Sequence, residues 1–320
     1  MPELPDIVIY IEQLQKRVLN EPIQSIRLLN PFVLRSVTPP LEQAVQRRVL
    51  ELHRLGKRIV FGLEDDLFLV LHLMIAGRLH WRPTNPVKAG RNGVAVFSFP
   101  SGSLLFTEAG SKKRASLHLV RGEAELQALN RGGVEVLDCD LPGFRAALLC
   151  ENHTLKRALT DPRLFSGIGN AYSDEILHRA RLSPVALTRR LPEEAVERLF
   201  SASQAILREW VERLREETGK AFPEKVTAFR PGMSVHGRFQ KPCPVCGTAV
   251  QRIAHAENEA NYCPCCQTGG KLLADRALSR LLKTDWPRTL EEMESRKAAA
   301  KGGPAGFKGV ANTARMRSVK

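Results

Sequence analysis

Apolar and polar positions follow two different periods along the chain, and the change between them divides it into three parts. Residues 7–18 place apolar side chains at helical spacing and polar side chains opposite them, which predicts an amphipathic helix. Between about residues 22 and 122, short apolar runs alternate with turn residues, which predicts strands. Short strands joined by tight turns are typical of an antiparallel sandwich or barrel. Two pairs of runs predict hairpins, namely 58–63 with 67–71 and 94–99 with 103–106.

The pattern becomes helical again after about residue 141. One predicted helix ends at Asp161-Pro162, and another covers residues 171–181. The stretch 165–170 between them contains two glycines, so the predicted order is helix, two tight turns, helix. Residues 192–217 carry the apolar stripe of one long amphipathic helix, which we interpret as core packing.

Four cysteines form two Cys-x-x-Cys pairs that are separated by 16 residues. Thiolates at this spacing predict one structural Zn²⁺ in a tetrahedral site that holds a hairpin. The predicted ligands are Cys243, Cys246, Cys263 and Cys266. Because four protein ligands leave no open position, the metal is not expected to be catalytic. Cys265 is an alternative fourth ligand, and disulfide bonds are the alternative to a metal.

The net charge of the chain indicates the kind of partner it binds. The 320 residues carry a formal net charge of +14 and the pI is about 9.8, which predicts a polyanionic partner, nucleic acid first and a membrane surface second. No apolar run has the length of a transmembrane helix, and the N-terminus lacks the pattern of a secretory signal, so we expect no membrane span and a cytoplasmic location. Residues 296–320 contain seven Lys or Arg and no Asp or Glu, which predicts a disordered basic tail.

The first residues offer a candidate catalytic pair. Removal of Met1 would leave Pro2 with a free secondary amine next to the carboxylate of Glu3. An α-amino group has a pKa near ~8, so a useful fraction is neutral at physiological pH. A neutral amine can form a Schiff base with an aldehyde-like carbon while the carboxylate moves protons. The alternative is an ordinary polar terminus.

Several positions are candidate phosphate contacts. Lys57 stands at the mouth of the first predicted hairpin, and Lys112, Lys113 and Arg114 form a basic run. Asn170 is expected at the start of a helix, where backbone N–H groups and the helix dipole favour an anion such as phosphate. Each has an ordinary alternative, because lone lysines and charge runs are usually solvated and Asn often caps a helix.

The combination of these features resembles the formamidopyrimidine-DNA glycosylase/endonuclease VIII family of bifunctional DNA glycosylases, over about residues 1–270. The resemblance implies an α+β multidomain fold. This fold has an N-terminal antiparallel β-sandwich with an N-terminal helix, a helix–two-turn–helix domain and a C-terminal zinc-finger β-hairpin. It also implies that a monomer excises oxidised bases from double-stranded DNA and cuts the strand at the abasic site by β- or β,δ-elimination.

The resemblance also implies domain limits and residue roles. The expected parts are a catalytic β-sandwich domain (1–135), a DNA-binding helical domain (136–232), the zinc hairpin (233–272) and the basic tail (273–320). By resemblance Pro2 is the Schiff-base nucleophile and Glu3 the acid and base. The implied DNA contacts are Lys57 and Asn170 on phosphates near the lesion, and Ile75 or Met74 as a wedge in the opened base stack.

Three departures from the family pattern limit what the resemblance implies. Asn258, a predicted DNA-binding position, stands where the family has a phosphate-binding Arg, and Glu257 is beside it. Residues 108–114 carry no aromatic residue where an Arg and a Phe fill the void left by the flipped base, and the segment 219–233 is short for a base-capping loop. One alternative is therefore a DNA-binding protein of the same architecture with weak or no glycosylase activity. An RNA-binding zinc-ribbon protein is the other alternative.

Overall fold

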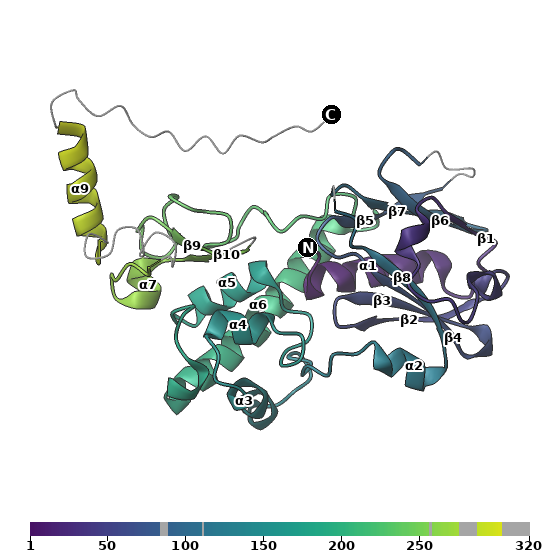
Figure 1. Ribbon diagram of the computed structural model, residues 1–320, viewed down its shortest axis with the longest axis horizontal. Coiled ribbons are helices and arrows are strands. Elements are labelled where there is room, and N and C mark those ends of the chain that lie inside the picture. The colour runs from purple at the N-terminus through teal and green to yellow at the C-terminus, as the bar shows by residue number, and fades with distance from the viewer. Residues whose placement is uncertain (84–88, 111, 256–257, 275–286, 303–320) are drawn as a thin grey trace.

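The structure, a computed structural model, describes residues 1–83, 89–110, 112–255, 258–274 and 287–302. Figure 1 shows a part with strands β1 to β8, a helical part around α3 to α6, and the hairpin of β9 and β10 beyond it. The predicted α+β multidomain fold is confirmed. Among the described residues, no helix is long and apolar enough to span a membrane.

Two four-stranded antiparallel sheets form the sandwich. The first has the order β1 (Ser25–Leu28), β6 (Gly93–Phe99), β7 (Gly102–Glu108) and β5 (Gly77–Arg82). The second has the order β2 (Val49–Leu55), β3 (Arg58–Leu63), β4 (Leu67–His72) and β8 (Ser116–Arg121). Apolar side chains of both sheets share one core, and short 3₁₀ helices η1 (Pro31–Val33) and η2 (Leu41–Ala44) connect strands at its rim.

Both predicted hairpins are present. β3 and β4 are joined by η3 (Glu64–Asp66), where Asp65 and Asp66 have φ angles of 61° and 56°. Aspartate tolerates this left-handed region better than most residues, which explains why an acidic run makes the turn. β6 and β7 meet at Gly102, whose φ of 151° suits a residue without a side chain.

Helix α1 (Leu4–Val18) is buried on two sides and joins the sandwich to the helical part. Leu4 and Ile9 pack in the helical core, whereas Tyr10 and Leu14 pack in the sandwich core. Each such side chain contributes about 1.5–3 kcal/mol of burial free energy. The helix begins three residues before the predicted start, because Pro5 is favourable in a first helical turn and Glu3 caps the helix. The chain terminus therefore lies between two cores.

Among the described residues, α2 (Gly122–Ala128) packs on the second sheet, and the helical part contains four further α-helices and a 3₁₀ turn. They are α3 (Leu141–Leu149), α4 (Leu155–Thr160), α5 (Asn170–Arg179), η4 (Thr188–Arg190) and α6 (Glu193–Thr218). The predicted long helix corresponds to α6, which ends at Gly219 with a φ of 55°. The predicted helix–two-turn–helix corresponds to α4 and α5.

The hairpin and the end of the chain follow. β9 (Gln251–His255) and β10 (Asn258–Tyr262) are antiparallel, and α7 (Pro264–Thr268) follows them. The tail prediction is wrong for residues 296–302, because helix α9 covers Leu290–Gly302. Thr289 accepts a hydrogen bond from the N–H of Glu292, and alanines 298–300 favour a helix. Residues 303–320 and the short helical stretch expected at 275–282 lie outside the described residues.

Candidate functional site

The carboxylate of Glu3 is bound at the N-terminus of α5. Its Oε2 accepts hydrogen bonds from the backbone N–H groups of Gly169 at 2.7 Å and Tyr172 at 3.2 Å. Its Oε1 accepts one from the N–H of Ala171 at 2.9 Å. Free N–H groups and the helix dipole stabilise an anion at this position. The sequence predicted a phosphate at these N–H groups, whereas in the structure the side chain of Glu3 accepts their hydrogen bonds.

Backbone contacts fix the residues around Glu3. The N–H of Glu3 donates to Oδ2 of Asp6 at 2.9 Å, and the N–H of Leu4 donates to the carbonyl of Gly167 at 3.0 Å. A Cβ added to Gly167 would lie 2.8 Å from the Cβ of Leu4, so the close approach needs glycine. Pro2 is buried. The chain terminus is therefore held in one place.

The amine at the terminus is partly withdrawn from water. Burial lowers its pKa below the ordinary value, the carboxylate of Glu3 opposes this shift, and the charge of Arg78 adds to it. This amine belongs to Met1 in the structure, and removal of Met1 would move the free amine to the adjacent, buried Pro2. A lowered pKa increases the neutral fraction that can attack a carbon.

Lys57 converges on the same helix end. It lies in the turn between β2 and β3, and a Cβ added to Gly169 would be 2.7 Å from its Nζ and 2.5 Å from Cδ of Glu3. Burial lowers the pKa of Lys57, whereas Glu3 raises it and Lys156 lowers it further. The structure thus brings together the terminus, Glu3 and Lys57, which are far apart in the sequence.

This convergence makes Gly169→Ala a direct test of the site. The added methyl group would displace the side chains of Glu3 and Lys57 by about 1 Å, and a displacement of this size can lower a catalysed rate about 100-fold. We expect that loss in single-turnover cleavage of abasic DNA at saturating protein. Gly90→Ala is the control, because its added Cβ meets no heavy atom within 4 Å. Equal rates for both variants would contradict the placement of the site.

Asn170 is the first residue of α5 and is half-buried. Its carbonyl accepts a hydrogen bond from Nζ of Lys156 at 2.7 Å, and Lys156 also pairs with the buried Asp174. Sequence reasoning missed Lys156, since nothing in its local pattern separates it from a solvated lysine. The backbone N–H groups at the start of α5 already donate to Glu3. A phosphate at this helix end would therefore have to be bound by side chains.

A turn between β4 and β5 presents the two wedge candidates. Ile75 is 54% exposed, whereas Met74 is half-buried and has a φ of 52°. Arg78 donates to the carbonyl of Ile75 at 3.2 Å, and its charge acts on the terminal amine. The turn is therefore close to the terminus, and Ile75 is the more accessible of its two large side chains.

The basic run lies beside this turn. The N–H of Ala109 donates to the carbonyl of Ala76, and the side chains of the run are exposed. The buried carboxylate of Glu108 holds the loop by accepting hydrogen bonds from the N–H groups of Arg114 and Ala115. The run consists of Lys112, Lys113 and Arg114, of which Lys113 donates to the carbonyl of Glu108.

Asp6 is another buried carboxylate, beside Glu3, and sequence reasoning missed it. It is 3% exposed and accepts from Arg230 at 2.6 Å as well as from the N–H of Glu3. Burial raises its pKa and the charge of Arg230 opposes that shift. Its place in the first helical turn was a signal for a capping role. The segment 219–233 is packed against α1, because Arg230 binds Asp6 while Phe222 and Val226 enter the sandwich core.

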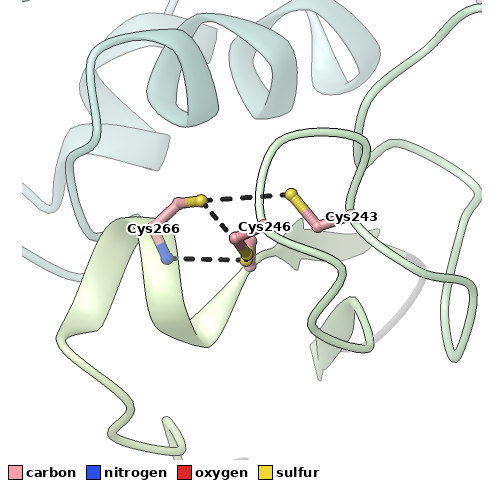
Figure 2. Close-up of side chains that lie close together, drawn as sticks. Cys243, Cys246 and Cys266 are labelled. Atoms are coloured by element: carbon pink, nitrogen blue, oxygen red, sulfur yellow. Dashed lines mark hydrogen bonds between the residues drawn. The ribbon is translucent and has the colours of Figure 1, made fainter.

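The four predicted zinc ligands form one cluster. Their sulfur atoms all lie within 4.8 Å of one another, and Figure 2 shows three of these side chains facing each other. The Sγ atom of Cys246 is 3.4 Å from that of Cys263 and 3.5 Å from that of Cys266, and Cys243 is 3.9 Å from Cys266. Tetrahedral zinc with bonds of 2.3 Å places its sulfurs about 3.8 Å apart, so the cluster fits one structural Zn²⁺. Cys265 lies outside it.

We expect Cys246→Ser to release the zinc and to disorder the hairpin. The binding free energy of a structural zinc is about 10–16 kcal/mol, far more than so short a hairpin supplies alone. The rest of the protein should stay folded, because its cores are separate. Elemental analysis measures the loss, and Cys265→Ser should retain one zinc. Zinc retained by Cys246→Ser would contradict the ligand set.

Helix α5 also holds the hairpin in place. The carboxylate of Glu175 accepts from the N–H groups of Ser234, Val235 and His236 at 2.7–2.9 Å. The neighbouring Asp174 binds His236 and, at 3.2 Å, Asn261 of β10. Asn258 begins β10 and pairs with His255 across the hairpin, and Glu257 lies outside the described residues. Helix α5 thus binds the Glu3 side chain at its N-terminus and the zinc-hairpin segment through Asp174 and Glu175.

Comparisons with known proteins agree with this architecture. The formamidopyrimidine-DNA glycosylase N-terminal domain matches residues 1–111, and the formamidopyrimidine-DNA glycosylase H2TH domain matches residues 135–221. A zinc finger found in FPG and IleRS matches residues 240–269. These three domains follow the sandwich, the helical part and the zinc hairpin in order.

Individual relatives cover most of the chain. The formamidopyrimidine-DNA glycosylase of Thermus thermophilus is 33% identical over 277 residues, which are 84% of this chain and 100% of that protein. An uncharacterized formamidopyrimidine-DNA glycosylase-like protein of Mycobacterium tuberculosis is 40% identical over 162 residues, 51% of this chain and 99% of that protein. The Lactococcus lactis Fpg, solved with THF-DNA and an inhibitor, has a TM-score of 0.75 at 25% identity and covers 83% of this chain and 100% of its own. The chain therefore belongs to the formamidopyrimidine-DNA glycosylase family of DNA repair enzymes.

Proposed function

We propose that this protein is a bifunctional DNA glycosylase and abasic-site lyase that acts as a monomer on double-stranded DNA with oxidised bases. The observation that carries the proposal is the convergence of the partly buried terminal amine, Glu3 and Lys57 at one helix end. Family membership supports the enzyme class. The DNA bound to the Lactococcus lactis relative supports the substrate.

The first half of the proposed reaction removes the base. A base in a duplex cannot reach the terminus, so the nucleotide turns out of the helix, and Ile75 fills the opened stack. The neutral amine of Pro2 attacks C1′ of the sugar, the bond to the base breaks, and the base leaves with the electron pair and gains a proton. Opening of the sugar ring then gives an iminium between C1′ and the nitrogen of Pro2.

The second half cuts the strand. The iminium makes the proton on C2′ acidic, and its removal expels the 3′ phosphate by β-elimination. Loss of a further proton expels the 5′ phosphate by δ-elimination, and water releases the sugar fragment from Pro2. Lys57 and the side chain of Asn170 are proposed to hold the phosphates beside the sugar during these steps, since both lie at the same helix end.

Glu3 is the proposed carrier of protons in both halves. A carboxylate offers about four lone-pair positions, and three are used by the N–H groups at the start of α5. The remaining position is available for a proton, while the three hydrogen bonds fix the direction in which it is offered. A rigid acid and base of this kind contributes about 10²–10⁴-fold to a rate.

The remaining DNA contacts and the domain limits belong to the same proposal. We propose that the exposed Lys112, Lys113 and Arg114 bind backbone phosphates beside the Ile75 turn. Asn258 supplies a weaker contact than the Arg it replaces, because an amide carries no charge. We propose the division into the catalytic domain 1–135, the helical domain 136–232, the zinc hairpin 233–272 and the chain end 273–320.

Borohydride trapping tests the proposed function. Protein without Met1 is incubated with a duplex that contains one abasic site, and borohydride reduces the Schiff base to a stable amine. We expect a covalent adduct on a denaturing gel, strand cleavage without borohydride, and neither with an undamaged duplex. If saturating protein gives no adduct and no cleavage, the proposal fails. A panel of duplexes, each with one oxidised base, then identifies the preferred lesion.

A further inference from the structure

A group of arginine and histidine side chains lies outside the site described above. β3 and β4 pair Arg58 with His72, and β4 and β8 pair Val70 with His118. Because paired residues and residues two apart share a face, Arg58, His72 and His118 project from the same face of the second sheet. Their neighbours Ile59 and Leu71 point into the sandwich core, so this face is the outer one.

Two further arginines complete the group. Helix α2 covers the apolar part of this face, and Arg131 follows it with an exposed side chain whose charge acts on Arg58 and His72. The N–H of Arg35 donates to the carbonyl of Leu117 in β8 at 2.8 Å, and the charge of Arg35 acts on His118. Five separate segments of the chain thus bring arginine and histidine side chains to one area.

Within the described part of the chain, this area offers no balancing anion. Burial lowers the pKa of His72 to about 4, and the charges that add to the shift come from Arg58, Lys57, His118 and Arg131. The buried Nε of Arg58 and Nδ1 of His118 have no hydrogen-bond partner among the described residues. Buried polar groups are normally paired, and like charges repel, so the arrangement suits a ligand that supplies acceptors and negative charge.

We propose that Arg58, His118 and Arg131 form a second phosphate site, which binds the DNA backbone next to the phosphate held at Lys57. The proposal rests on the proposed function and extends its DNA contact along the strand. Arg58 offers a planar fork of donors that matches a phosphate, His118 offers a ring nitrogen, and Arg131 supplies charge. The group lies beside Lys57 in sequence, at Arg58, and in space, because the charge of Lys57 also lowers the pKa of His72. A group of this form suits successive phosphodiesters better than one free phosphate ion.

The salt dependence of DNA binding tests the site. The ligand is a duplex with a tetrahydrofuran abasic analogue, which the protein binds without forming a Schiff base, and affinity is measured by fluorescence anisotropy over a salt series. Arg58→Gln and Arg131→Gln should each lower the slope of log affinity against log salt by about one unit. Arg145→Gln is the matched control, because this exposed α3 residue pairs with Glu193 and its loss changes net charge equally. The control should leave the slope unchanged.

A scan of single neutral methylphosphonate linkages identifies the phosphate. At one position near the lesion the neutral linkage should weaken binding of the wild-type protein about tenfold and should weaken Arg58→Gln no further. At every other contacted position, the losses of binding free energy from the neutral linkage and from Arg58→Gln should add. Inorganic phosphate serves as the competitor that separates a free-ion site from a backbone site.

The outcomes separate this inference from the proposed function. Loss of trapping by the wild-type protein overturns the proposed function, whereas normal trapping with unchanged salt slopes for both variants overturns the second site alone. Competition by inorganic phosphate that requires Arg58, together with strict additivity at every linkage, overturns the assignment to DNA. Circular dichroism checks folding, and the exposed Arg131 keeps the test valid if Arg58→Gln unfolds.

Discussion

A protein with two residues added before Pro2 should form no borohydride-trapped adduct with abasic DNA, although it should still bind the duplex. The added peptide bond converts the amine of Pro2 to an amide, whose nitrogen has no free electron pair for attack on C1′. The phosphate contacts should survive, because Lys57, Asn170 and the basic run are not altered. Trapping on a denaturing gel and anisotropy with a tetrahydrofuran duplex measure the two properties separately.

The same two residues placed after Lys320 are the control and should leave trapping at the wild-type level. Lys57 is the alternative nucleophile, because burial also lowers its pKa and its Nζ lies beside Glu3. An adduct formed by the extended protein and lost in Lys57→Arg would move the nucleophile to Lys57. An adduct lost only in the extended protein supports Pro2.

Local patterns predicted the elements whose residues are fixed by their near neighbours. Two apolar runs on either side of the acidic turn at residues 64–66 predicted the β3–β4 hairpin, and both runs are buried strands in the structure. The stop signal at Gly219 placed the end of α6 within one residue. The tail prediction failed at 296–302 because the local signal from Thr289 and Glu292 outweighed the excess of positive charge.

The candidate site depends on contacts that no local pattern contains. Glu3 and Gly169 are 166 positions apart, and only the fold shows that the carboxylate of one occupies the helix end predicted for a phosphate. Asp6 and Lys156 were missed for the same reason, since their partners Arg230 and Asp174 are remote or unremarkable in sequence. The zinc ligands were the exception, because four cysteines at fixed spacing encode a metal site directly.

Glu3→Gln should lower base excision by about 10²–10⁴-fold while trapping on a preformed abasic site falls much less. An abasic sugar already carries its aldehyde, so the Schiff base forms without a proton for a leaving base. Base excision needs that proton, and an amide cannot supply it. Single-turnover excision and trapping with the same protein preparation give the two rates.

The stability of Glu3→Gln needs its own control. Three N–H groups donate to the two oxygens of the Glu3 carboxylate, and the amide has only one oxygen. At least one of the N–H groups of Gly169, Ala171 and Tyr172 then faces another donor, which costs about 1–3 kcal/mol of stability. Glu175→Gln is the matched variant, since the carboxylate of Glu175 also accepts three backbone N–H groups but lies at the zinc hairpin. Both variants should lose similar stability in thermal unfolding, and only Glu3→Gln should lose excision at saturating protein. Equal loss of excision by both would reduce the role of Glu3 to holding the fold.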